Sequence, residues 1–173
     1  MLKSQLKHIQ CDATHTDAQT QNKTINFLCT HHRDWLYFNS HLGLDYLHQM
    51  QLKGEILAEQ QCWQEALPQL GCAWETSQIL LDIYGTEHLN LITRLGCLTV
   101  LLHHCLEQLE QVELAQQVCA QASNKLLQAV AAVKPETDEY AYIMQCIAHL
   151  RNPAQFSLYL MNSTSGIEQW PIH

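Results

Sequence analysis

The stretch WQEALPQLGCAWETSQILLDIY, residues 63–84, decides the fold class, because its apolar and small side chains follow a helical period. These side chains stand alternately three and four residues apart, so they form one continuous stripe along a helix of about six turns. The stripe consists of Trp63, Ala66, Leu70, Ala73, Ser77, Leu80 and Tyr84. Its alanines would let a neighbouring helix approach closely. We therefore expect one long helix that packs against others along its length.

A second stretch, VELAQQVCAQASNKLLQAVAAV at residues 112–133, repeats this stripe at an offset of 49 residues. Its matching positions are Val112, Ala115, Cys119, Ala122, Leu126, Ala129 and Val133. The same offset relates three sets of apolar positions upstream of the stripes: Leu42, Leu91 and Tyr140; Tyr46, Leu95 and Met144; Leu52, Leu101 and Leu150. This register predicts an internal repeat of helical hairpins.

Residues that end or begin helices separate the apolar stretches. Gly85 can close a helix, Pro135 prevents one from continuing, and Thr137 suits the start of the next. We expect an all-α array of antiparallel hairpins with about six to seven helices, at residues 25–37, 41–59, 62–84, 88–108, 110–133, 137–150 and 153–161. A single domain would cover residues 24–162, between a polar N-terminal segment (1–23) and a C-terminal tail (163–173).

Composition excludes several classes of function. The 173 residues are 47% hydrophobic and 15% charged, as in one globular domain. With 17 acidic and 9 basic residues the net charge is -8, which disfavours binding to nucleic acid. No uninterrupted apolar run approaches the roughly 20 residues of a membrane span, so no membrane association is expected. The start Met1–Gln5 lacks the apolar stretch of a signal peptide, and a cytoplasmic location is expected.

Cysteine and histidine are abundant, with 8 Cys and 11 His, but no two cysteines are spaced C-x-x-C. The cysteines are typical of small buried residues in a reducing compartment. His41, Asp45 and His48 lie at i, i+4 and i+7, which leaves a metal or redox sensor as an alternative function. A Gly-rich phosphate loop, H-E-x-x-H and G-x-S-x-G are all missing, so we expect neither an enzyme nor a cofactor.

The stretch LKGEILAEQQCWQEALP, residues 52–68, resembles the tetratricopeptide repeat family. Gly54 takes the place of the small residue where the two helices of a repeat cross, and Trp63 takes the aromatic place. The join YGTEH (84–88) is similar to the linker of long, kinesin-light-chain-like repeats. The resemblance implies repeats at about 41–87 and 88–136 and a degenerate cap at 137–161. The second repeat departs from the pattern, since His103 replaces the crossing glycine and Val112 the aromatic residue.

Members of this family have no chemistry of their own and hold a peptide or partner helix in a groove lined by the first helix of each repeat. The resemblance implies a non-catalytic interaction module such as an adaptor, chaperone or regulator. Its groove residues would be His48, Gln51, Glu55, Glu59, Cys97, His104, Glu107 and Gln108. The glutamates among them favour a basic or polar protein or peptide ligand.

A structural homodimer is a further alternative. The stripe of residues 112–133 could form an intermolecular seam, although its match to the stripe of residues 63–84 makes an intramolecular role simpler. Exposed aromatic residues near the ends of the array (Trp35, Phe38 or Phe156) could also support self-association.

Overall fold

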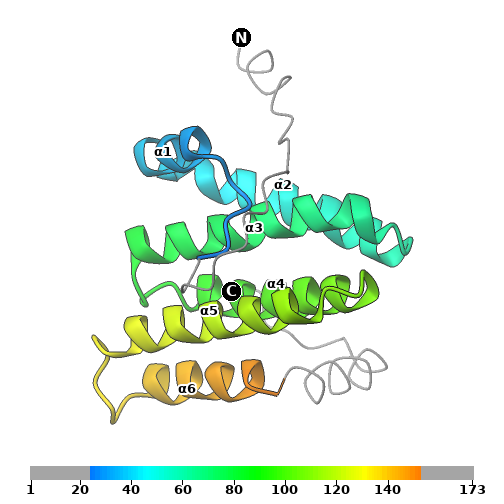
Figure 1. Cartoon of the computed structure of the whole chain (residues 1–173). Helices are drawn as coiled ribbons and strands as arrows, with labels where there is room; N and C mark the ends of the chain where they lie inside the picture. Colours follow the sequence, from blue (N-terminus) through cyan, green and yellow to red (C-terminus); the bar gives the residue numbers. More distant parts are fainter. Residues whose placement is uncertain (1–23, 153–173) are drawn as a thin grey trace, which may run out of the picture.

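The computed structural model describes residues 24–152, and this part of the chain is helical, with no strand (Figure 1). The helices are α1 (Thr30–Phe38), α2 (Ser40–Glu59), α3 (Trp63–Tyr84), α4 (Leu89–Gln108), α5 (Val112–Val130) and α6 (Asp138–Leu150). The predicted all-α array is confirmed. The polar segment 1–23, the helix expected at 153–161 and the tail lie outside the described residues.

The helices pair in chain order, α2 with α3 and α4 with α5, and α6 packs on both α4 and α5. The stripe of residues 63–84 forms the centre of the core, since five of its seven members have no exposed surface: Ala66, Leu70, Ala73, Ser77 and Leu80. Trp74 is also fully buried, and its indole Nε1 donates to Thr99 Oγ1 of α4 at 3.0 Å. The helix that decides the fold class therefore packs on both neighbours.

The turns α2–α3 and α4–α5 have the same geometry at positions 49 residues apart. Gln61 (φ 58°) and Glu110 (φ 60°) both adopt the left-handed conformation. The next N–H in each turn reaches back five residues, from Cys62 to the carbonyl of Leu57 (2.9 Å) and from Gln111 to that of Leu106 (2.8 Å). This bond is typical of the Schellman motif, which closes a helix. The repeat seen in the sequence thus extends to the backbone of the turns.

Glycine at these two turn positions should stabilise the protein. Non-glycine residues in the left-handed region cost about 1 kcal/mol each, so we expect Gln61→Gly and Glu110→Gly each to raise the free energy of unfolding by up to that amount. A rise of the melting temperature by about 2–4 °C, followed by circular dichroism, would report it. Gln60→Gly is the control, because Gln60 has φ -79° and should gain nothing. Equal effects of Gln60→Gly and Gln61→Gly would contradict the prediction.

At the point where their two helices cross, the two hairpins carry the small and the large residue on opposite helices. In the first, a Cβ atom at Gly54 would lie 2.6 Å from Leu70 Cδ2, so a small residue on α2 faces a large one on α3. In the second, the residues 49 positions later are His103 on α4 and Cys119 on α5. The large residue is now on the first helix and the small one on the second. The departure at His103 therefore leaves the hairpin intact, with His103 buried.

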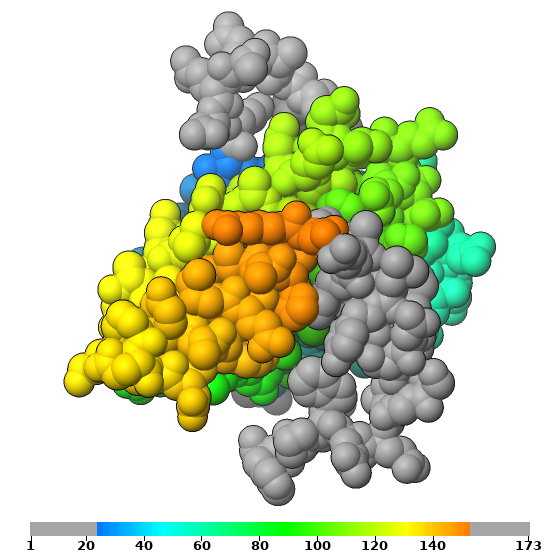
Figure 2. All heavy atoms as spheres, turned by 90° about the horizontal axis from the view of Figure 1, so that it is seen from below, coloured from blue at the N-terminus to red at the C-terminus, as the bar shows by residue number. Residues whose placement is uncertain are grey.

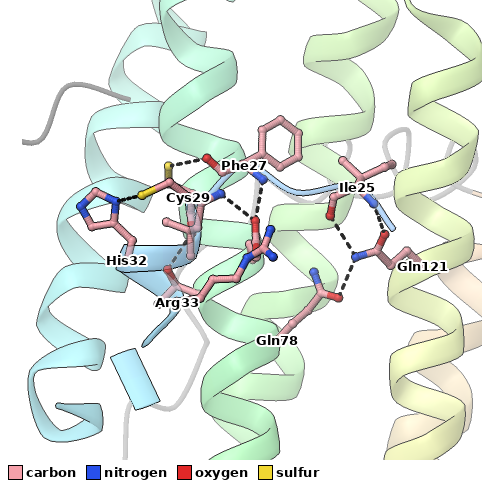
Figure 3. A network of polar contacts seen from close by, with 11 residues as sticks. Ile25, Phe27, Cys29, His32, Arg33, Gln78 and Gln121 are labelled. Carbon is pink, nitrogen blue, oxygen red and sulfur yellow. Dashed lines mark hydrogen bonds and ion pairs between the residues drawn. The ribbon is translucent and has the colours of Figure 1, made fainter. Parts of the chain in front are cut away.

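The first helix begins later than the sequence predicts, at Thr30 instead of residue 25. The residues before it, 24–29, are not helical and run across α3 and α5, where Glu75 and Gln121 bind their backbone (Figure 3). These contacts satisfy backbone groups that a helix would have used internally. A tertiary interaction thus overrides the local preference of this apolar stretch.

Within the described range, α4 has the length and composition of a membrane span, with a mean hydropathy of 1.3. However, 56% of that window is buried inside the array, and the core helix of a soluble protein passes the same test. Polar residues interrupt the sequence of α4, so it contains no uninterrupted apolar run of the length of a membrane span.

Candidate functional site

The first helices of the hairpins, α2, α4 and α6, share one surface, on which residues 49 positions apart come together. The hydroxyl groups of Thr93 on α4 and Tyr142 on α6 are hydrogen-bonded at 2.6 Å. Cys97 lies close enough to Cys146 on α6 and Glu55 on α2 for both to raise its pKa. We call these five residues the first-helix surface. Its members come from all three helices.

The thiols and the phenol of this surface are held in their neutral forms. Partial loss of water raises the pKa of Cys97, and negative charge on Cys146 and Glu55 raises it further. Desolvation also raises the pKa of Tyr142 and of Cys146. The hydrogen bond with Thr93 opposes this rise at Tyr142, and the hydrogen bond with Tyr142 opposes it at Cys146. Since the thiolate is the reactive form of cysteine, this environment does not favour a redox role for Cys97 or Cys146.

Three of the predicted groove residues belong to or border this surface. Glu55 and Cys97 are members, and Gln51 lies beside Glu55, to whose Oε1 it donates at 2.8 Å. The oxygen of the same amide, Gln51 Oε1, is buried and has no hydrogen-bond partner within the described part of the chain. The first-helix surface therefore contains a carboxylate and a phenol, and the buried acceptor of Gln51 lies next to the carboxylate.

Two of the remaining predicted residues, His104 and Glu107, contact other neighbours. The ring of His104 packs edge-on against Trp63 at 5.4 Å, at the start of α3. Glu107 pairs with His103 (3.4 Å) and raises the pKa of Cys119, so it faces α5. The other three, His48, Glu59 and Gln108, are exposed on α2 and α4.

The sequence interpretation missed Thr93, Tyr142 and Cys146. A signal for them was present, because Cys146 follows Cys97, and Tyr142 follows Thr93, at the repeat offset. Applying the offset of 49 to the predicted Cys97 would have placed Cys146 on the first-helix surface.

A hollow of about 380 Å³ lies near the second helix crossing. Its lining comes from α4, α5 and the end of α6, and Figure 2 shows α6 (orange) beside α5 (yellow). Its lining is mixed: His103, Gln116, Cys119, Ala120, Ser123, Asn124, Leu127, Leu150 and Arg151. The hollow arises where Cys119 replaces the larger leucine of the first hairpin.

The geometry also bears on the two alternative functions, a metal sensor and a structural homodimer. The proposed metal ligands His41, Asp45 and His48 are all exposed, and no group of three or more His, Cys, Asp or Glu residues in the region 24–152 is arranged to hold a metal ion. The proposed seam of residues 112–133 is committed to the core, since Ala115, Ala122 and Leu126 have no exposed surface. Phe38, at the end of α1, is 84% exposed and remains available for self-association.

Two thiols buried in the core should make stability depend on alkaline pH. Burial raises the pKa of Cys105 and of Cys119 to about 11 each, above the value of an unfolded thiol. The folded state then binds more protons than the unfolded state between about pH 9 and 11, so the free energy of unfolding should fall as pH rises through that window. Urea titrations at about pH 8 and about pH 10.5 would measure the fall. It should become smaller in Cys105→Ala/Cys119→Ala, and an unchanged fall would contradict this assignment.

Comparison with protein-family models, with curated proteins and with solved structures gives no match to this chain.

Proposed function

We propose that the chain is a non-catalytic protein-interaction module of tetratricopeptide-like design, which binds a basic or polar peptide or partner helix on the first-helix surface. One observation carries the proposal: Thr93 and Cys97 on α4 interact with their repeat equivalents Tyr142 and Cys146 on α6, and the charge of Glu55 on α2 also acts on Cys97. A surface formed by three helices can contact a ligand at several points.

The chemistry of the surface supports a peptide ligand with positive charge. Glu55 supplies a carboxylate, and Glu59 lies one helical turn later on α2. Tyr142 adds an amphipathic ring of the kind enriched in binding interfaces, and the buried Gln51 Oε1 lacks a donor in the described residues. A lysine or arginine side chain, or a backbone N–H, would satisfy these acceptors.

Affinity capture from native cell lysate, with wild type beside Glu55→Lys/Glu59→Lys, tests the proposal. We expect at least one partner to be retained by wild type and lost by the variant, because two charge reversals replace attraction by repulsion. A matched control, Glu87→Lys/Glu136→Lys, makes the same charge change at exposed glutamates outside the helices. Equal helicity and melting temperature of the three proteins must be shown first.

The outcomes separate a binding surface from a solvated one. Loss of the partner in the first variant and its retention in the control would support the first-helix surface. If both variants lose the partner, net charge alone explains the capture. If both keep it, the glutamates of α2 do not contribute to binding and the proposal fails.

A further inference from the structure

On the opposite layer of the array, α3 and α5 hold an extended segment through its backbone. Gln121 of α5 binds both polar groups of one residue: its Oε1 accepts from the N–H of Ile25 at 2.9 Å, and its Nε2 donates to the Ile25 carbonyl at 3.3 Å. Glu75 of α3 accepts from the N–H groups of Phe27 (2.5 Å) and Leu28 (2.8 Å) through Oε2. In Figure 3, Ile25 of the segment lies beside Gln121, and dashed lines mark the two hydrogen bonds between them.

In this arrangement, side chains of two helices form the hydrogen bonds to an extended backbone that a neighbouring strand would form in a sheet. A bidentate amide and a carboxylate that accepts two N–H groups recognise backbone whatever the sequence, as an edge strand does in β-augmentation. Glu75 is 6% exposed and also accepts from Arg33 Nε at 2.5 Å, so its position is fixed. Two helices thus carry a built site for extended peptide.

Specificity comes from a notch for an aromatic ring. Gly71 of α3 leaves room for Phe27, since a Cβ atom there would lie 2.2 Å from the ring. The ring also packs edge-on against Trp74, with 6.0 Å between ring centroids. Leu28 is 3% exposed, whereas Asn26 between the two anchored residues Ile25 and Phe27 is exposed. The site therefore selects a pattern of apolar, any residue, aromatic, apolar.

The resident segment leaves one donor of the site unused. Gln78 of α3 is 7% exposed, and its Oε1 faces Gln121 Nε2 at 3.4 Å, but its Nε2 is buried without a partner in the described residues. A buried donor without an acceptor costs about 1–3 kcal/mol. A peptide that brings an acceptor to Gln78 would bind better than residues 25–28 do.

We propose that the surface of α3 and α5 that holds residues 25–28 is a second peptide-binding site. Residues 25–28 occupy it as a built-in competitor, and its external ligand is an extended partner segment with the Ile-x-Phe-Leu pattern. The site lies on α3 and α5, apart from the first-helix surface, and does not depend on it. Binding of a partner there would require release of residues 25–28, so the site is closed until a competing segment displaces them.

Fluorescence anisotropy with a labelled peptide of residues 23–31, carrying Cys29→Ser to prevent oxidation, tests this on the full chain. In Phe27→Ala the notch is empty and the resident segment is weakened. We expect this variant to bind the peptide at least about tenfold more tightly than wild type, in which the segment must first leave. Ile25→Ala, a milder change of the same segment, should shift binding in the same direction and serves if Phe27→Ala does not fold.

Gly71→Ala in the Phe27→Ala background provides the matched control. With the resident ring removed, the added methyl group meets no Phe27 atom and fills the notch, so peptide binding should weaken at least about tenfold while helicity is kept. A peptide carrying Phe27→Ala should not bind any of the proteins. Equal affinity for wild type and both segment variants, or for the notch-filled protein, would overturn the proposal.

Size-exclusion chromatography distinguishes a second copy of this chain from a different partner. If wild type is a dimer that Phe27→Ala converts to a monomer, the site on α3 and α5 binds residues 25–28 of a second copy. The proposal of an external ligand then fails. A monomer in both cases, together with the affinities expected above, supports it.

Discussion

Replacing Glu75 by alanine should lower the free energy of unfolding by about 3 kcal/mol or more. The carboxylate is almost fully buried and accepts from the backbone of Phe27 and Leu28 and from the side chain of Arg33. Its removal leaves three donors without their acceptor in the interior, and one of them is charged. The expected result is a lower urea midpoint with loss of the contact between residues 24–29 and α3, measured by chemical unfolding.

Two further substitutions separate the effect of burial from that of charge. Glu75→Gln keeps one acceptor oxygen and should be less damaging than Glu75→Ala, since it still meets part of the hydrogen-bond demand. Asp82→Ala breaks a comparable ion pair, with Lys125 of α5, at a site where Asp82 is 48% exposed. Exposed pairs contribute about 1 kcal/mol or less. If Glu75→Ala costs no more than Asp82→Ala, the buried network does not hold residues 24–29 in place.

Gly54→Ala and Gly96→Ala, the same chemical change in two helices, should have opposite effects on stability. At Gly54 the new Cβ atom would lie 2.6 Å from Leu70 Cδ2 and 3.1 Å from the Leu70 backbone nitrogen. The backbone cannot yield as a side-chain end can, so α2 and α3 must separate, at a cost of about 1–3 kcal/mol. At Gly96 an added Cβ atom would meet no atom of the described residues within 4 Å, apart from the backbone of its own helix. The helix-forming preference of alanine should therefore add about 1 kcal/mol.

Thermal unfolding of the two variants beside wild type measures this contrast directly. The expected order of melting temperatures is Gly96→Ala above wild type, and wild type above Gly54→Ala. A stabilised Gly54→Ala would mean that the two helices do not meet at this residue. Leu70→Ala in the Gly54→Ala background tests the cause, because removing the facing side chain should recover part of the loss that is due to the clash.

The extent to which the sequence predicts the fold differs between the long helices and the first one. Residues 63–84 and 112–133 carry their packing face in their own spacing, and α3 and α5 form there with only the end of α5 shortened, to Val130. Residues 25–29 contain the apolar side chains of a helix, but the decisive contacts are with Glu75 and Gln121. Local periodicity cannot register an interaction with a residue 96 positions away.

The candidate site is predictable to a similar, partial degree. A helical wheel places Glu55 and Cys97 on the same side of consecutive first helices, and in the structure the charge of Glu55 acts on the thiol of Cys97 and raises its pKa. A helical wheel does not show that Glu107 faces α5. In the structure Glu107 pairs with His103 and lies near Cys119, at a crossing where the large residue is on the first helix and the small one on the second. Glu75 gives no local signal either, since a single charged residue in an apolar helix has many explanations before its partners are seen.

The two contacts of Gln121 with Ile25 have a kinetic consequence. The hairpins close through turns whose hydrogen bonds span five residues, so each can form early and independently. The contact between Ile25 and α5 spans 96 residues and can form only after α3, α4 and α5 have assembled. Residues 25–28 thus dock last when the chain folds and detach first when it unfolds. The amide protons of Phe27 and Leu28 should therefore exchange with solvent before those of the hairpins that the segment holds together.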